Sequence, residues 1–239
     1  MDGFVSSIQS MGTLDGPGVR FVVFLQGCPL RCGYCHNPET QAGMGGTKYS
    51  AEEIAGKALR FKEYFGAQGG ITLSGGEPLL QAEFAAEIFE KCKQNGINTC
   101  LDTSGSVINE NVKKLIDLSD YIMLDIKFTD DSDYLKYVGC TLSKPLEFLK
   151  MLNLKNKRVR IRQVIVPTLN DGDENLQRLC EIVKNNPCVE MVELLPFKKI
   201  CKTKYDALDM PFLFDVYESA GDISHLQQKL NDMIKKETT

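Results

Sequence analysis

Three cysteines lie close together near the start of the chain. Cys28, Cys32 and Cys35 form the pattern C-x3-C-x2-C. Three thiolates on one loop can bind three of the four irons of a 4Fe–4S cluster and leave the fourth iron without a protein ligand. A metal with an open coordination position can bind substrate, as it does in catalytic zinc sites. Clusters that only carry electrons usually have four cysteine ligands, so three cysteines indicate chemistry at the cluster itself.

Three other interpretations compete for these cysteines. A zinc site would need a fourth ligand, and His36 is poorly placed because it directly follows Cys35. The run Cys32-Gly-Tyr-Cys35-His36 also matches a c-type haem attachment motif, but that attachment normally takes place outside the cytosol. Thiols with no ligand would be open to oxidation. The 4Fe–4S interpretation is therefore favoured.

Composition and charge limit the class of protein. The chain has 239 residues, of which 43% are hydrophobic and 25% charged, as in an ordinary globular domain. Its net charge of −4 argues against electrostatic binding to nucleic acid or to an anionic membrane. The longest apolar run, Phe21–Leu25, is far too short to span a membrane, and the N-terminus does not look like a signal peptide. We expect a cytoplasmic protein without a disulfide framework, in which the six cysteines outside the motif are buried thiols.

Short β-branched runs alternate with amphipathic stretches along the chain. The pattern predicts strands at 19–25, 71–73, 97–101, 121–124, 159–166 and 189–194. It predicts helices from Ser50 to about Phe65, at 82–95, 109–118, 144–154 and 173–185, and from about Asp222 to Lys236. This alternation predicts an α/β fold with parallel strands, built as a partial (β/α)6 TIM-like barrel in a single domain over residues 1–239. An open doubly wound sheet is the alternative.

Polar residues follow the predicted strands one after another. Cys28 follows the first strand, Ser74-Gly-Gly-Glu77 the second, Asp102-Thr-Ser-Gly105 the third and Asp125-Ile-Lys127 the fourth, while Arg162 lies in the fifth. Ligands bind at the carboxyl ends of parallel strands, so these units are expected to contribute to one site.

The chain resembles the radical S-adenosylmethionine (SAM) superfamily, and within it the enzymes that activate glycyl radical enzymes. Tyr34 is the aromatic residue that these enzymes have before the third cysteine. The other matching motifs follow in order between residues 15 and 205: Asp15-Gly-Pro-Gly-Val-Arg20, Ser74-Gly-Gly-Glu77, Leu101-Asp-Thr-Ser-Gly105, Met123-Leu-Asp-Ile-Lys127, Ile161-Arg162 and Glu193-Leu-Leu-Pro196.

The resemblance implies an activity and a cofactor site. In that family the open iron of the cluster chelates SAM, and one-electron reduction cleaves SAM to methionine and a 5′-deoxyadenosyl radical, which takes a hydrogen atom from a backbone glycine of a partner protein. The implied ligands of the 4Fe–4S cluster are Cys28, Cys32 and Cys35. The implied SAM contacts are Tyr34, Cys35, His36, Gly75, Gly76, Glu77, Asp125, Ile126, Lys127, Arg162 and Lys198.

A monovalent cation beside SAM is also implied. Its ligands would be Asp102, Thr103, Met123 and Asp125, although from the sequence alone Asp102 is equally an N-cap for the following helix. Asp15 corresponds by resemblance to a family position near the glycine peptide of the partner. Its alternative role is to stabilise the turn Asp15-Gly-Pro-Gly18. Ser74-Gly-Gly-Glu77 taken alone would also be read as a tight turn.

The partner implied by the resemblance is a glycyl radical enzyme, pyruvate formate-lyase or a relative, and the implied electron donor is a low-potential protein such as flavodoxin. No cysteine lies between Cys35 and Ser74, so the ferredoxin-like insert of many other members is absent, which favours the formate-lyase type. Two positions depart from the family. Lys198 replaces a histidine that normally lies near SAM, and Cys201 replaces a glycine.

Other functions stay open at this point. A radical SAM enzyme that acts on another glycyl radical enzyme or on a small molecule would share the cysteine motif. An iron–sulfur electron carrier would also bind a cluster, but its spectrum should not change when SAM is added.

Overall fold

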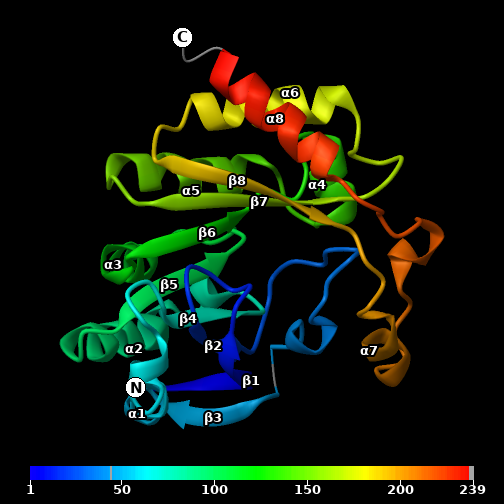
Figure 1. Cartoon of the computed structure of the whole chain (residues 1–239). Coiled ribbons are helices and arrows are strands. Elements are labelled where there is room, and N and C mark those ends of the chain that lie inside the picture. The colour runs from blue at the N-terminus through cyan, green and yellow to red at the C-terminus, as the bar shows by residue number, and fades with distance from the viewer. Residues whose placement is uncertain (44, 237–239) are drawn as a thin grey trace. The chain divides into compact units, whose positions relative to one another are not determined.

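The computed structural model describes residues 1–43 and 45–236, and these form two compact units. The first unit contains Met1–Pro29 and Glu39–Met123, and the second contains Leu30–Pro38 and the chain from Leu124 onward. Both units are built from strands with helices beside them (Figure 1). The boundary falls within one strand and within the loop that carries the three cysteines, so each unit is described separately below.

All six predicted strands are present. They are β2 (Arg20–Leu25), β4 (Gly70–Gly75), β5 (Asn98–Thr103), β6 (Tyr121–Asp125), β7 (Val159–Ile165) and β8 (Val189–Pro196). The strand order is β3-β1-β2-β4-β5-β6-β7-β8, and the pairs β2–β4, β4–β5 and β7–β8 are parallel. The six predicted strands therefore follow each other in chain order. A doubly wound sheet would reverse direction partway through its strand order, so this alternative is excluded.

Two strands of the first unit were not predicted. β1 (Asp2–Gly12) pairs with β2, β3 (Thr47–Ser50) pairs with β1, and both pairings are antiparallel. β1 has only three buried residues, Gly3, Val5 and Gly12, and β3 has none. Hydrophobic runs indicate strands, and these two largely exposed strands do not have such runs. The parallel strands are thus extended at one side by an antiparallel pair.

The helices of the first unit begin and end near the predicted positions. α1 (Ala51–Leu59) starts with the expected capping box, in which Ser50 and Glu53 bind each other's backbone N–H groups. It ends at Leu59, before the predicted end at Phe65, because the chain continues as the 3-10 turn η2 (Lys62–Tyr64). α2 (Ala82–Gln94) and α3 (Glu110–Leu118) pack against each other, and α1 packs on α2.

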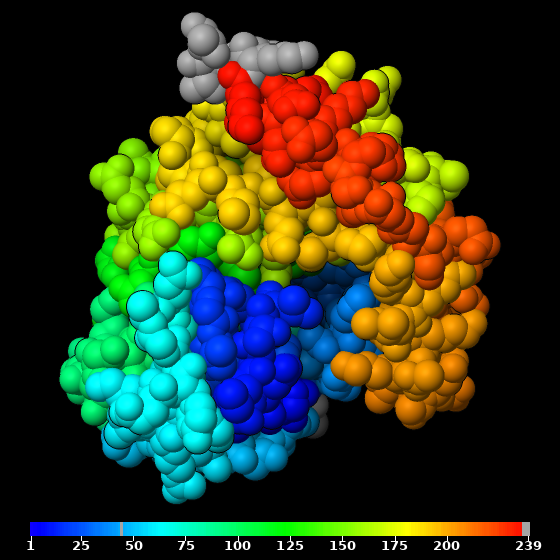
Figure 2. Space-filling model, viewed as in Figure 1, coloured from blue at the N-terminus to red at the C-terminus, as the bar shows by residue number. Residues whose placement is uncertain are grey.

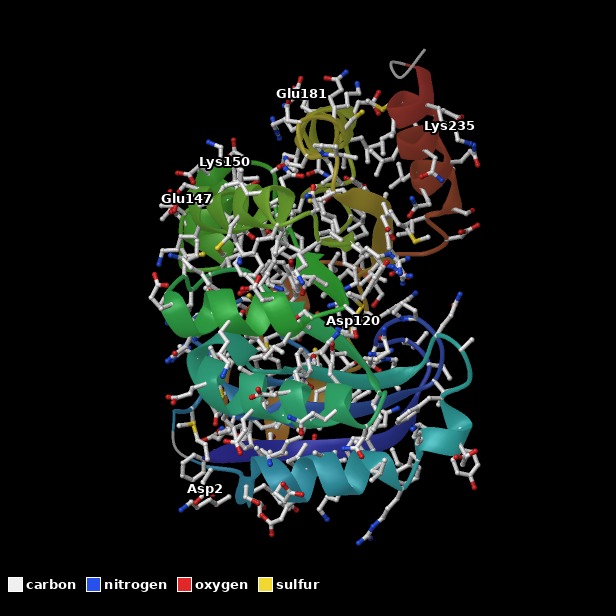
Figure 3. All side chains as sticks on the ribbon, turned by 90° about the vertical axis from the view of Figure 1, so that its left-hand side faces the viewer. Asp2, Asp120, Glu147, Lys150, Glu181 and Lys235 are labelled. Atoms are coloured by element: carbon white, nitrogen blue, oxygen red, sulfur yellow. The ribbon has the colours of Figure 1, made fainter. Side chains whose placement is uncertain are left out.

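The second unit has three predicted helices and two that were not predicted. α5 (Ser143–Leu154), α6 (Asp173–Lys184) and α8 (Ser224–Lys236) match the amphipathic stretches. Glu147 and Lys150 of α5 and Glu181 of α6 point away from the strands into solvent (Figure 3). α4 (Asp131–Tyr137) and α7 (Lys202–Ala207) are only two turns long or less, too short for a clear periodicity.

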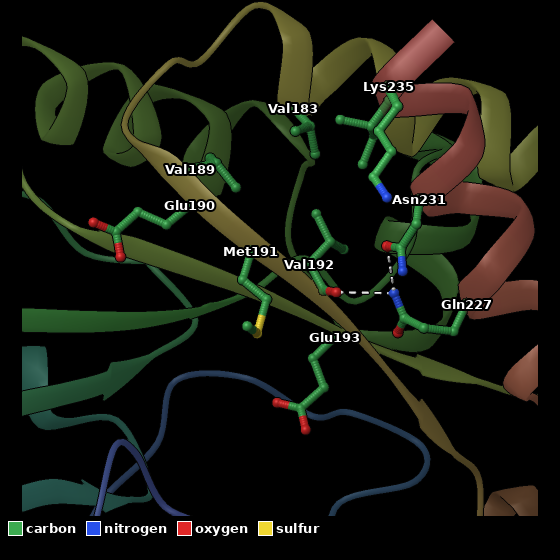
Figure 4. A pocket seen from close by; sticks show the side chains of 10 residues that line it. Val183, Val189, Glu190, Met191, Val192, Glu193, Gln227, Asn231 and Lys235 are labelled. Atoms are coloured by element: carbon green, nitrogen blue, oxygen red, sulfur yellow. Dashed lines mark hydrogen bonds between the residues drawn. The ribbon is translucent and has the colours of Figure 1, made fainter.

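α8 lies beside the last strand of the sheet. It packs on α6 and β8, and its side chains lie over those of β8 in Figure 2. A pocket of about 420 Å³ lies between β8 and α8, with Met191 and Val192 on one side and Gln227 and Asn231 on the other (Figure 4). Among the described helices, none is long and apolar enough to cross a membrane.

Candidate active site

Cys28 lies just after β2, in the first unit, and is half-buried. The backbone that leads to Cys28 is held by Gln26, whose side-chain amide donates to the carbonyls of Glu39 and Ala42 at 3.0 and 2.9 Å. The backbone N–H of Gly27 donates to the carbonyl of Thr40 at 2.8 Å. These bonds hold the chain that enters the cysteine motif against the segment that follows the motif.

Gly75 and Gly76 lie where β4 ends beside β2. Gly75 has a φ of +110°, and a Cβ there would lie 2.3 Å from the backbone nitrogen of Leu25. A Cβ on Gly76 would lie 2.1 Å from the carbonyl oxygen of Gly27, and the Gly76 N–H donates to the carbonyl of Leu25. Any side chain would separate the two strand ends. The glycines thus have a packing role here in addition to the predicted approach of SAM to the backbone.

Glu77 is buried, with 1% of its surface exposed, and both of its carboxylate oxygens accept hydrogen bonds. Oε1 accepts from the Thr103 hydroxyl at 2.5 Å and from the N–H of Leu79, and Oε2 accepts from the N–H and the hydroxyl of Ser104. Burial raises the pKa of Glu77, and the bonds from Ser104 and Thr103 oppose that rise in part. Glu77 therefore links the ends of β4 and β5. Ser104, which lies in the quoted Leu101–Gly105 motif, was not singled out.

Two of the residues proposed for the cation lie at the end of β5. Asp102 accepts a hydrogen bond of 2.7 Å from the Ser74 hydroxyl, and it is not a helix N-cap, because Asn109 caps α3. The Thr103 hydroxyl donates to Glu77. Met123 in β6 is buried in a cluster with Cys100 and Tyr121. These three residues belong to the first unit, whereas Asp125 belongs to the second.

The loop that contains Asp15 is held by Arg20. The Arg20 guanidinium is fully buried and donates to the Thr72 hydroxyl at 3.0 Å and to Asn98 Oδ1 at 2.9 Å. The Thr72 hydroxyl in turn donates to the carbonyl of Asp15 at 2.7 Å. Arg20, the last residue of the Asp15–Arg20 motif, therefore fixes the Asp15 loop against β4 and β5.

Cys32 and Cys35 lie on a loop of the second unit, where Cys32 is buried and Cys35 half-buried. The N–H of Cys35 donates to the carbonyl of Cys32 at 3.1 Å, which closes a turn between the two thiols. No three His, Cys, Asp or Glu side chains among the described residues converge as a single metal ion requires. In a 4Fe–4S cluster each cysteine binds a different iron, so such convergence is not needed. Three thiols on one ordered loop fit the donor chemistry of the cluster.

Tyr34 lies in an aromatic cluster within the second unit. Its ring contacts those of Phe128, Phe197 and Phe214, with ring centroids 6.1, 6.5 and 5.3 Å away, and its hydroxyl lies 3.5 Å from the carbonyl of Lys127. Burial raises the pKa of Tyr34 well above its ordinary value. The side chain is therefore a packing element of the loop.

His36 and Lys198 lie together in the second unit. The His36 ring nitrogen Nε2 lies 3.2 Å from the carbonyl of Lys198, and burial lowers the pKa of His36. The Lys198 ammonium donates to the carbonyl of Ala220 at 2.5 Å, so its contact with SAM stays a prediction. Lys204, which was not singled out, donates to the carbonyl of His36 and to Asn37 Oδ1, both at 2.9 Å.

Asp125, Lys127 and Arg162 form a half-buried charge cluster at the end of β6 and in the middle of β7. The Asp125 carboxylate lies 3.0 Å from the Lys127 ammonium and 2.9 Å from the Arg162 guanidinium. Burial alone would raise the pKa of Asp125, but the two cations outweigh it and lower that pKa. Burial alone would lower the pKa of Lys127, but the neighbouring Asp125 carboxylate outweighs burial and raises that pKa. All three groups are thus charged at neutral pH. Ile126, which lies between Asp125 and Lys127 in the sequence, is buried, and its N–H donates to the carbonyl of Arg162.

Comparison with known proteins identifies the family. Residues 22–180 match the family model of the radical SAM superfamily. The chain is 46% identical over 211 residues to the pyruvate formate-lyase-activating enzyme of Clostridium pasteurianum, with 88% of each chain covered. It is 40% identical over 216 residues to the pyruvate formate-lyase 1-activating enzyme of Escherichia coli, with 89% of this chain and 88% of the relative covered.

Solved structures show the same fold. The Streptococcus suis protein SuiB bound to its precursor peptide SuiA aligns with a TM-score of 0.74 at 16% identity, over 97% of this chain and 48% of SuiB. A domain of pyruvate-formate lyase-activating enzyme from Bacteroides vulgatus aligns with a TM-score of 0.58 at 22% identity, over 71% of this chain and 95% of that domain. The predicted partial barrel is confirmed. The chain belongs to the radical SAM superfamily and, within it, to the family of pyruvate formate-lyase-activating enzymes.

Proposed function

We propose that the protein activates pyruvate formate-lyase by removing a hydrogen atom from a backbone glycine of that enzyme. The observation that carries this proposal is the identity of 40–46% to pyruvate formate-lyase-activating enzymes over almost nine-tenths of the chain. The family model spans residues 22–180, which include parts of both units, so we propose that the two units work as one radical SAM domain.

Cys28, Cys32 and Cys35 would hold the 4Fe–4S cluster. When bound, the cluster supplies the low-potential electron for SAM cleavage and an open iron for the amino and carboxylate groups of SAM. Reductive cleavage of SAM would give methionine and a 5′-deoxyadenosyl radical, which would take the glycine hydrogen atom and become 5′-deoxyadenosine. The products are thus methionine, 5′-deoxyadenosine and a glycyl radical on the partner.

The charge cluster of the second unit supports the binding of SAM. Lys127 and Arg162 both bring a positive charge to this part of the second unit, and both contact the Asp125 carboxylate. A cation attracts the SAM carboxylate, and a guanidinium can bind it through two hydrogen bonds. We assign this role to Arg162, and we assign contacts along the ribose and methionyl part of SAM to Asp125, Ile126 and Lys127.

The remaining SAM contacts come from the resemblance. Gly75 and Gly76 would present backbone atoms to the methionyl ammonium, Glu77 would stabilise that cationic end, and Tyr34, Cys35 and His36 would border the adenine. Lys198 would contact SAM in place of the usual histidine. A monovalent cation would be bound by Asp102, Thr103, Met123 and Asp125, of which the two aspartates supply oxygen ligands of the kind that hard cations prefer.

We propose a flavodoxin-like protein as the electron donor and the cytoplasm as the location. No disulfide joins the nine cysteines, all of which lie within the described residues. Thiols that stay reduced are typical of the cytosol, where a low-potential donor is also available.

The test is anaerobic. The reconstituted protein is mixed with SAM, a strong reductant and pyruvate formate-lyase, and the electron paramagnetic resonance spectrum is recorded while 5′-deoxyadenosine is assayed. We expect a glycyl radical signal together with 5′-deoxyadenosine. Cys32→Ala should abolish both, whereas Cys188→Ala should leave both unchanged, because Cys188 lies in the same unit but outside the motif. Formation of 5′-deoxyadenosine without the radical would point to another substrate. The absence of both products with an intact cluster would refute the proposal.

A further inference from the structure

The turn between Cys32 and Cys35 is held on one side by the end of α4. The N–H of Gly33 donates to the carbonyl of Tyr137 at 2.9 Å, and the N–H of Arg31 donates to the carbonyl of Val138 at 2.9 Å. These two bonds fix the backbone path before and inside the turn. They do not contact the opposite side of Gly33 or the ring of Tyr34, which must be held by another part of the chain.

Phe214 lies on that other side. It belongs to the 3-10 turn η4 (Leu213–Val216), which follows the last strand by 17 residues and buries only this one side chain. Leu213 and Val216 are 67% and 82% exposed, whereas Phe214 is 1% exposed. Its ring meets those of Tyr34 and Tyr137 edge-on, with both centroids 5.3 Å away. A short, otherwise exposed segment therefore places one aromatic ring beneath the cysteine turn.

The fit between Gly33 and Phe214 is close. A Cβ on Gly33 would lie 2.2 and 2.4 Å from the Cε2 and Cδ2 atoms of Phe214, which is too short for any real contact. Gly33 is not among the glycines with positive φ, so its backbone would accept alanine. The glycine is therefore required by the ring of Phe214 and not by the backbone conformation.

We infer that Phe214 is a positioning residue for the cysteine loop. It fills the space that the missing side chain of Gly33 leaves, and it orients Tyr34, so that Cys32 and Cys35 are presented with a fixed spacing. The consequence for the cluster rests on the proposed function, because it assumes that these two cysteines bind the cluster. The contact between Gly33 and Phe214 is independent of that assumption.

A double-mutant cycle tests the contact. The variants are Gly33→Ala, Phe214→Val and the double variant. Valine lacks the Cδ and Cε atoms that the new methyl group would meet. Phe214→Met is a second choice if valine leaves too large a cavity, because a flexible thioether can yield to the methyl group. Gly172→Ala is the matched control, since Gly172 lies in the same unit and a Cβ there meets nothing within 4 Å.

The first measurement is the apparent Tm of the protein, and the second is the rate at which a chelator removes iron from the reconstituted cluster. We expect Gly33→Ala to lower Tm by roughly 2–10 °C and to speed iron loss by about tenfold, as overpacking does. In a protein that already carries Phe214→Val, the same Gly33→Ala change should lower Tm much less and speed iron loss much less. Gly172→Ala replaces the N-cap residue of α6, so it should lower Tm only slightly and leave the rate of iron loss unchanged.

Two outcomes would overturn the inference. One is a Gly33→Ala variant that behaves as Gly172→Ala does. The other is a double variant in which the two single effects simply add. Failure of the proposed function has a different signature: the unchanged protein would form no 5′-deoxyadenosine, while the Tm cycle would still show the coupling between Gly33 and Phe214.

Discussion

Gln227 of α8 binds the backbone of Val192 at the outer edge of β8. Its side-chain Nε2 donates to the carbonyl of Val192 at 3.0 Å (Figure 4). Its Oε1 accepts from the N–H of Leu194 at 2.8 Å. One amide side chain thus makes the two hydrogen bonds that a neighbouring strand would make. β8 is the last strand of the sheet, and exposed strand edges tend to pair with other chains.

Gln227→Ala should therefore promote self-association. We expect a concentration-dependent dimer or larger species in sedimentation velocity, because the backbone groups of Val192 and Leu194 lose their partner. Gln228→Ala is the control, since within the described part of the chain the Gln228 side chain bonds to Asp232 of the same helix. Equal behaviour of the two variants would contradict the prediction.

Glu77→Gln should destabilise the first unit. The Glu77 carboxylate accepts from Thr103, Ser104 and Leu79, and an amide nitrogen can accept none of these bonds. Leaving buried donors unsatisfied costs about 1–3 kcal/mol each. Urea unfolding should show a lower midpoint, whereas Glu83→Gln on the exposed side of α2 should unfold as the unchanged protein does.

Arg162→Gln should weaken SAM binding. The change removes one of the two cations that contact the Asp125 carboxylate, and with it the guanidinium that we assign to the SAM carboxylate. We expect the KM for SAM to rise by roughly tenfold or more, because a hydrogen bond to a charged group contributes about 1.5–3 kcal/mol. Arg158→Gln, which alters an exposed ion pair with Glu190, should leave KM unchanged. An unchanged KM in Arg162→Gln would remove Arg162 from the SAM site.

Asp120 should contribute to the acid sensitivity of the first unit. Burial would raise its pKa, but the Lys93 ammonium and the N–H and hydroxyl groups of Thr99 lower it. A carboxylate with a lowered pKa stabilises the folded state at pH values above its ordinary pKa of about 3.9, and this contribution is lost as pH falls through the lower folded value.

Asp120→Asn should therefore reduce the slope of stability against pH below about pH 4, as measured by urea unfolding at a series of pH values. Asparagine can keep one acceptor oxygen for Thr99, so the fold should survive. Glu63→Gln, which changes an exposed carboxylate of the first unit, is the control. If the stability of Asp120→Asn and of the unchanged protein falls equally with decreasing pH, the ion pair between Asp120 and Lys93 contributes nothing to the free energy of unfolding.

Local patterns were enough to predict the six parallel strands, most of the helices and the residues at the strand ends. A buried parallel strand such as β2 contains a continuous apolar run, and a capped helix such as α1 has its signal within four residues, so both can be predicted without knowledge of their neighbours. The order of the motifs from Asp15 to Pro196 likewise depends only on the sequence, and it was sufficient to predict the family.

The tertiary structure decided what depends on contacts between distant residues. β1 and β3 are strands because β2 and β1 supply their hydrogen-bond partners, and not because of their own apolar content. The bonds from Thr103 and Ser104 to Glu77 join residues 26 and 27 positions apart. Phe214 lies in a stretch with no periodic pattern, and its buried ring packs against Gly33, 181 positions earlier, where a side chain would leave it no room. Such complementarity arises when the chain folds, since neither residue carries a local signal of the other.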